Sequence, residues 1–167
     1  MNSTLFVPFL FLSLLFLQVF VCNTILLFGY INPYIYISFV IFYPLRKERY
    51  LFLSLSFLLG LCIDLFSDSG GIHAFALLFV AYIRLLFVRL IFKKTEPDYL
   101  LFDLKQEPLG NVFNYVMILI LIHHFILFSF ANFSLQNFST VVYNTLYASL
   151  FTAVLFFAGT YIIRKKT

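Results

Sequence analysis

Long uncharged apolar runs dominate the pattern of this chain, and the charged residues fall mostly in the short segments between them. Most runs reach roughly 20 residues, the length at which a helix crosses a hydrocarbon core of about 30 Å. They lack the alternation that marks the strands of a membrane barrel. The pattern predicts an all-α integral membrane protein, a compact bundle of about six transmembrane helices with a short second one. The predicted helices cover residues 5–28, 33–44, 50–66, 72–92, 112–131 and 140–163.

The second predicted helix, residues 33–44, is too short for an ordinary crossing. Asn32 is a candidate N-cap for it, and Pro33 suits the first turn of a helix. A re-entrant segment, or a crossing that is mismatched to the membrane thickness, would have a similar length.

Composition supports the same class of protein. Of the 167 residues, 63% are hydrophobic and only 11% are charged, whereas a soluble domain carries about 25% charged residues. The formal net charge of +4 would suit nucleic acid, but the basic residues gather at the ends of the apolar runs. We therefore expect contact with membrane lipid and no nucleic-acid binding.

The positions of Lys and Arg predict the orientation in the membrane. Apart from Arg84 and Arg89 in the fourth predicted helix, they occur between the second and third predicted helices, between the fourth and fifth, and at the end of the chain. The other connections contain none. The positive-inside rule then places both termini in the cytoplasm. The one sizeable loop, residues 93–110, would be cytoplasmic as well. Its apolar patch YLLFDL fits either a loop that lies on the membrane surface or a docking site for a cytoplasmic partner.

Residues 60–84 concentrate the polar side chains within the apolar runs. Asp64 and His73 are predicted to lie within roughly 5 Å of the same outer boundary, on consecutive helices. An ion pair or hydrogen bond between them would close this hairpin. Arg84 lies roughly 18 Å deeper, so we expect it to extend toward the cytoplasm or to meet a polar group elsewhere in the bundle. For Asp64, a role in helix packing or partner contact is favoured over a role in ligand binding or proton transfer.

The turn SDSGG joins these two helices. Asp68 is expected to be a solvated turn residue, and Gly70 and Gly71 supply the backbone freedom that a tight turn needs.

Further polar residues lie in the first and fifth predicted helices. Gln18 and Asn23 form a polar stripe suited to interhelical hydrogen bonds. His123 and His124 are adjacent, so their side chains point about 100° apart and are not expected to share one metal. One of them is expected to face the bundle, and the other a neighbouring helix, lipid or water.

The sequence contains no P-loop, GxSxG, HExxH, CxxC or paired-carboxylate motif. We therefore expect no catalytic residues, metal or cofactor, and no enzymatic activity.

The chain resembles a known protein family in several spaced residues of the third and fourth predicted helices and of the turn between them. The chain length, the number of spans and a glutamine in the first span agree with the same family. The residues are Gly60-Leu61-x-x-Asp64, Gly71-x-His73-Ala74 and Ala81-Tyr82. They resemble the core signature of MreD, a family of rod shape-determining membrane proteins of bacteria.

The resemblance implies a non-enzymatic scaffold of the cell-elongation complex in the bacterial inner membrane. Such a scaffold would act with MreC as its principal partner, with MreB filaments, with the RodA glycosyltransferase and with the elongation transpeptidase. The resemblance also implies a fold similar to the six-helix substrate-binding subunits of energy-coupling-factor vitamin transporters. Gly60, Asp64, Gly71 and His73 would then shape the hairpin that supports contact with MreC.

Two other functions stay open. A vitamin-binding transport subunit typically carries a face of small residues on its first helix, and residues 5–28 contain no alanine, which counts against this alternative. A membrane-embedded enzyme of lipid or envelope metabolism would need polar residues clustered at one depth, which only Asp64, Asp68 and His73 approach.

Overall fold

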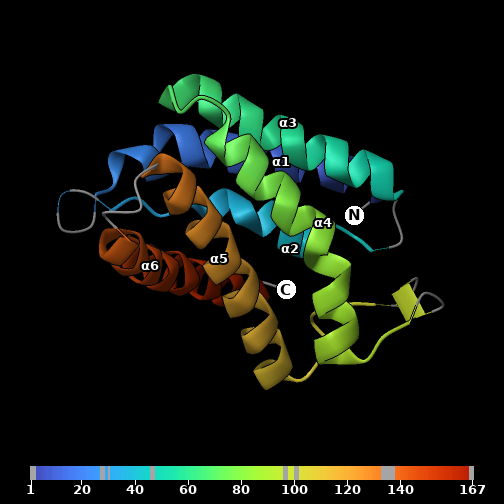
Figure 1. Ribbon diagram of the computed structural model, residues 1–167. Helices are drawn as coiled ribbons and strands as arrows, with labels where there is room; N and C mark the ends of the chain where they lie inside the picture. Colours follow the sequence, from blue (N-terminus) through green and yellow to red (C-terminus); the bar gives the residue numbers. More distant parts are fainter. Residues whose placement is uncertain are drawn as a thin grey trace.

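The computed structural model is a bundle of helices (Figure 1). It describes residues 3–26, 29, 31–45, 48–95, 98–99, 102–132 and 138–165, with the side chains of residues 3–4 and 163–165 left out. The α-helices are α1 (Ser3–Phe20), α2 (Ser38–Phe42), α3 (Arg49–Ser67), α4 (Ile72–Phe92), α5 (Leu109–Ala131) and α6 (Phe138–Lys165). Two 3₁₀ turns, η1 (Cys22–Thr24) and η2 (Ile35–Ile37), lie between α1 and α2.

Five of these helices are long and apolar enough to cross a membrane, namely α1 with its extension through η1, α3, α4, α5 and α6. This agrees with the expectation of a helical protein with several membrane spans. The bounds of α4 are those predicted, while α5 begins at Leu109 instead of residue 112. The earlier start follows from Pro108, which takes the N-cap position and accepts a hydrogen bond from the Val112 amide at 3.0 Å. The loop before α5 therefore ends at Pro108.

The second predicted helix is wrong as a continuous span. Residues 33–44 contain only η2 and the five-residue α2. Asn32 is not an N-cap, because η2 starts at Ile35 without a side-chain cap. The side-chain Nδ2 of Asn32 instead donates to the Asn23 backbone carbonyl at 3.0 Å. The side chain of Gln18 bonds the backbone of Pro33 and Ile35, which holds the start of the segment outside a helix.

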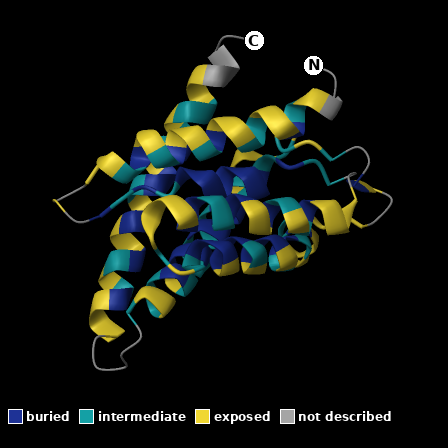
Figure 2. Ribbon diagram, turned by 90° about the horizontal axis from the view of Figure 1, so that it is seen from above, coloured by how far each residue is buried: buried dark blue, intermediate teal, exposed yellow. Residues whose placement is uncertain are grey.

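Residues Ile35 to Tyr43, which we call the central segment, form the middle of the bundle. All but Phe42 are buried, and they contact α1, α4 and α6. In Figure 1, α2 lies between the longer helices, and Figure 2 shows buried residues along the middle of the bundle with exposed residues outside. A segment too short to span can lie at membrane depth only if protein surrounds it.

Helices α3 and α4 form a closely packed antiparallel hairpin. A Cβ atom added to Gly60 would lie 2.5 Å from the Ala74 Cα, so the absence of a side chain permits this approach. The turn between the helices uses positive φ angles at Asp68 (49°), Gly70 (67°) and Gly71 (96°). Glycine adopts these angles without steric cost, as expected from the sequence. Asp68 is exposed.

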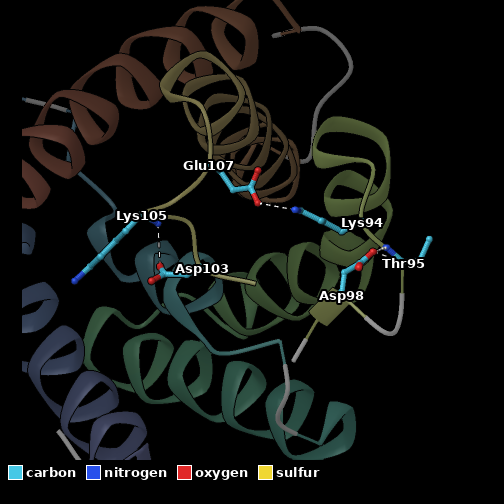
Figure 3. Close-up of polar contacts among 6 residues, drawn as sticks. All are labelled: Lys94, Thr95, Asp98, Asp103, Lys105 and Glu107. Atoms are coloured by element: carbon cyan, nitrogen blue, oxygen red, sulfur yellow. Dashed lines mark hydrogen bonds and ion pairs between the residues drawn. The ribbon is translucent and has the colours of Figure 1, made fainter. Parts of the chain in front are cut away.

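Polar contacts order the loop between α4 and α5 (Figure 3). Lys94 forms an ion pair with Glu107 at 3.1 Å, and Asp103 accepts a hydrogen bond from the Lys105 amide at 2.9 Å. The backbone amide and the hydroxyl of Thr95 both donate to Asp98, which holds the pKa of that carboxyl group below its usual value.

The described apolar residues of this loop face the bundle. The Tyr99 hydroxyl accepts a hydrogen bond from Arg89 at 2.9 Å, and the Phe102 ring lies 5.2 Å from the ring of Phe92. Leu104 packs against the same core. Within the described part of YLLFDL, the apolar side chains therefore pack on the protein itself. Leu100 and Leu101 lie outside the described residues.

We predict that Gly60→Ala destabilises the protein by about 1–3 kcal/mol, because the new methyl group must push α3 away from the α4 backbone. Gly159→Ala in α6 is the matched control, since a Cβ there meets nothing within 4 Å. Thermal unfolding of the two purified variants in detergent measures the difference. Equal midpoints for both variants would contradict the close α3–α4 contact.

Candidate functional site: a hydrogen-bonded polar interior

Apart from Asp68, which is exposed, the candidate functional residues lie in or beside three buried groups. One group joins α3 to the start of α4, a second holds the two ends of the central segment, and a third connects a tyrosine with histidines from two helices. In each group, a side chain from one element forms hydrogen bonds with the backbone or side chains of another element.

Asp64 lies at the first junction, where its carboxyl group binds the N-terminus of α4. Its Oδ1 accepts from the His73 amide at 3.0 Å and its Oδ2 accepts from the Ala74 amide at 2.8 Å. The Ser69 hydroxyl also donates to Oδ1, at 2.6 Å. The first amides of a helix have no partner within the helix, and the N-cap residue of α4, Gly71, has no side chain to offer. Asp64 supplies the missing cap from the neighbouring helix.

This arrangement refines the predicted contact between Asp64 and His73. The contact exists, but the His73 backbone makes it, and the imidazole turns to a different partner. A carboxyl group at a helix N-terminus is favoured by the helix dipole as well as by the two hydrogen bonds. The approach of Gly60 to Ala74, one turn earlier on the same face of α3, brings Asp64 into reach. Gly60, Asp64, Gly71 and His73 thus meet at one junction.

Gln18 and Thr152 hold the start of the central segment. The fully buried Gln18 donates to the Pro33 carbonyl at 3.1 Å and accepts from the Ile35 amide at 3.0 Å. Thr152 accepts from the Tyr34 amide at 3.0 Å. These bonds connect the segment to α1 and α6.

Asn23 extends this group toward α3. Its Oδ1 accepts from Gln18 at 2.9 Å, and its amide nitrogen donates to the Ser67 hydroxyl at 3.1 Å. Gln18 and Asn23 therefore bond each other, and Asn23 also bonds the end of α3.

Arg84 holds the other end of the central segment. It is only 2% exposed, and its Nη2 donates to the carbonyls of Tyr43 at 2.7 Å and Ile41 at 3.3 Å. Its Nε donates to the Tyr115 hydroxyl at 3.0 Å. Of the two predicted alternatives, Arg84 meets polar groups elsewhere in the bundle and does not extend toward solvent. The C-terminal carbonyls of a short helix are natural acceptors for such a cation.

Tyr36 connects two helices through histidines. Its hydroxyl lies 2.7 Å from Nδ1 of His73 and 2.9 Å from Nε2 of His123. One hydroxyl provides a single donor, and it accepts as well, so it donates to one imidazole and accepts from the other. The result is a buried chain from α4 through the central segment to α5.

His124 lies in the protein interior too. Its Nδ1 is 2.7 Å from the Ile120 carbonyl of its own helix, and its Nε2 is 3.1 Å from the Thr152 hydroxyl of α6. His123 and His124 are both fully buried, because α5 packs between α4 and α6. Contact of either histidine with lipid or water is therefore ruled out in this structure.

Several residues of this interior were not predicted from the sequence as hydrogen-bonding partners, namely Tyr34, Tyr36, Tyr115 and Thr152. Tyr36 could have been identified as such a partner from the sequence. It lies within a predicted membrane-spanning helix, where a tyrosine hydroxyl usually requires a hydrogen-bond partner. In the described part of the chain, no three His, Cys, Asp or Glu side chains come together as metal ligands.

The fold and its interior define a helical protein with five helices long and apolar enough to cross a membrane. Most of its buried polar side chains bond one another or the backbone. Comparison of the chain with protein-family models, with curated proteins and with solved structures finds no match.

We predict that Asp64→Asn lowers stability by about 2 kcal/mol, because the amide nitrogen cannot accept from the backbone of α4 and the charge at the helix N-terminus is lost. Asp68→Asn is the matched control, as Asp68 is exposed and asparagine tolerates the left-handed conformation. Chemical denaturation in detergent compares the two. Similar losses in both variants would show that Asp64 is not the cap.

Tyr36→Phe should cost about 1–3 kcal/mol, since it leaves ring nitrogens of two buried histidines without their partner. Tyr143→Phe removes a hydroxyl from an exposed tyrosine of α6 and should be neutral. Thermal unfolding in detergent distinguishes the variants. A neutral Tyr36→Phe would mean that the hydroxyl contributes nothing to the interior.

Proposed function

We propose that this protein is a non-enzymatic membrane scaffold of the bacterial cell-elongation complex. In this role it lies in the cytoplasmic membrane with both termini in the cytoplasm. It links MreC and cytoplasmic MreB filaments to peptidoglycan synthesis by RodA and the elongation transpeptidase.

The observation that carries the proposal is the junction between α3 and α4. The residues that resemble the MreD signature are separated along the chain, and five of them, Gly60, Asp64, Gly71, His73 and Ala74, build that junction. Each has a structural task there: close approach, helix capping or a tight turn. A signature made of such residues suits a protein whose work is to present a rigid hairpin to a partner.

The outer face of α4 offers a surface for that partner. Phe75, Phe79, Tyr82 and Leu86 are exposed and follow a helical spacing of three and four residues. The Phe75 and Phe79 rings stack with centroids 6.4 Å apart. We assign this stripe to contact with a transmembrane helix of MreC, for which packing of apolar side chains is the main attraction in lipid.

The interior favours a scaffold over the transport alternative. Its buried polar groups mostly bond one another or the backbone. The cavity beside Arg84 has a volume of about 30 Å³, whereas pockets for small organic ligands measure about 300–1,000 Å³.

Two experiments in the organism of origin test the proposal. Affinity purification of the protein from membranes should bring down MreC, and depletion of the protein should turn rod-shaped cells round. If rods persist after depletion and MreC does not copurify, the scaffold role is wrong. Tight binding of a vitamin by the purified protein would support the transport alternative instead.

Phe79→Ala should reduce the amount of copurified MreC severalfold, because it truncates the middle of the α4 stripe. Leu150→Ala removes another exposed apolar side chain, from α6, and should leave the yield of MreC unchanged. Both variants should unfold at the temperature of the parent protein, as neither side chain is buried. An equal effect of the two substitutions would exclude the α4 stripe as the contact.

A further inference from the structure

A small cavity lies beside Arg84 where α3 and α4 meet the end of the central segment. Its volume is about 30 Å³, and its lining includes Tyr43, Arg49, Phe52 and Arg84. A space of this size admits one or two atoms the size of a water oxygen. Arg49, which is exposed, lines it as well and lies with its guanidinium carbon 5.2 Å from the centre of the Tyr82 ring.

The positive charge of Arg84 has no carboxylate partner among the described residues. Its three hydrogen bonds go to neutral oxygen atoms, two backbone carbonyls and the Tyr115 hydroxyl. Nη1 takes part in none of these bonds. Because a buried charge is costly without a counter-charge, this site favours an anion.

Tyr43 supplies a second unused group. Its side chain is 2% exposed and lines the cavity, yet its buried hydroxyl has no hydrogen-bond partner in the described part of the protein. Buried hydroxyl groups are nearly always hydrogen-bonded. An anion at this position would accept from the hydroxyl of Tyr43 and from Nη1 of Arg84.

The depth of the cavity suits a group at the membrane surface. Arg84 lies 5.2 Å from the Phe52 ring, and Phe52 is one helical turn from the start of α3, a rise of about 4.5 Å. The cavity thus lies about one turn inside the start of α3, and Arg84, which lines it from α4, is eight residues or about 12 Å before the end of that helix. Basic pockets between transmembrane helices at this level bind lipid head groups.

We propose that this cavity is a phosphate-binding site that receives one phosphoryl oxygen of a phospholipid head group. The oxygen lies between Arg84 and the Tyr43 hydroxyl, and Arg49 at the rim contacts the remaining phosphate oxygens. The acyl chains lie along the apolar outer surface of the bundle. This site adjoins the partner contact on α4, because Arg49 at its rim lies over the Tyr82 ring. Its test uses purified protein without a partner, so either proposal can fail without the other.

The test uses the full-length protein, purified and delipidated in detergent. Dioleoylphosphatidylglycerol is compared with dioleoylglycerol, which has the same acyl chains without the phosphate, and with inorganic phosphate at millimolar concentration. Native mass spectrometry measures the bound lipid, and thermal unfolding measures the stabilisation that binding gives.

Tyr43→Phe is the informative variant. It removes a hydroxyl that makes no hydrogen bond in the protein itself, so the lipid-free variant should be as stable as the parent. Tyr143→Phe, on the exposed face of α6, is the matched control.

Phosphatidylglycerol should bind and raise the unfolding temperature while dioleoylglycerol does not. Tyr43→Phe should weaken this binding about tenfold, and Tyr143→Phe should not change it. Inorganic phosphate could stabilise the protein as much as phosphatidylglycerol does, with the stabilisation lost in Tyr43→Phe. This result would support a phosphate site but overturn the lipid as the source of the phosphate. Equal binding of the two lipids, or an unchanged affinity in Tyr43→Phe, would overturn the proposal.

Discussion

The backbone hydrogen bonding of the central segment is the constraint on which the rest of the structure depends. Residues Ile35 to Tyr43 lie in the middle of an apolar bundle, where an unpaired amide or carbonyl costs several kcal/mol. The segment is too short to satisfy its own ends. Gln18 and Thr152 bond its start and Arg84 bonds its end, so that α1, α6 and α4 are each fixed to it.

The same requirement explains the hairpin of α3 and α4. The first amides of α4 are buried, and Asp64 satisfies two of them from the neighbouring helix. Gly60 matters because it brings the helices close enough for this cap. In the scaffold role that we propose, these contacts keep the outer face of α4 in a fixed position for a partner. The polar residues of the interior then serve the geometry of the protein rather than a reaction.

The long helices could be predicted from the sequence because length and apolar composition determine them, and α4 has the predicted bounds. The central segment could not, because its partners are remote: Tyr34 and Thr152 are 118 residues apart. Arg84 bonds backbone carbonyls, which any residue carries, so no sequence pattern identifies them. Asp64 was predicted at the correct end of the hairpin. Its partners, the backbone amides of His73 and Ala74, depend on how α3 and α4 pack, and the periodicity of the sequence does not define this packing.

Hydrogen–deuterium exchange of the purified protein tests the central claim most directly. Amides of the central segment, including that of Ile35, should exchange as slowly as those in the middle of α4, although the segment consists only of a 3₁₀ turn and a five-residue α-helix. Gln18→Ala should accelerate exchange at Ile35 while leaving the middle of α4 unchanged. Exchange of the central segment as fast as that of the loop between α4 and α5 would contradict the account.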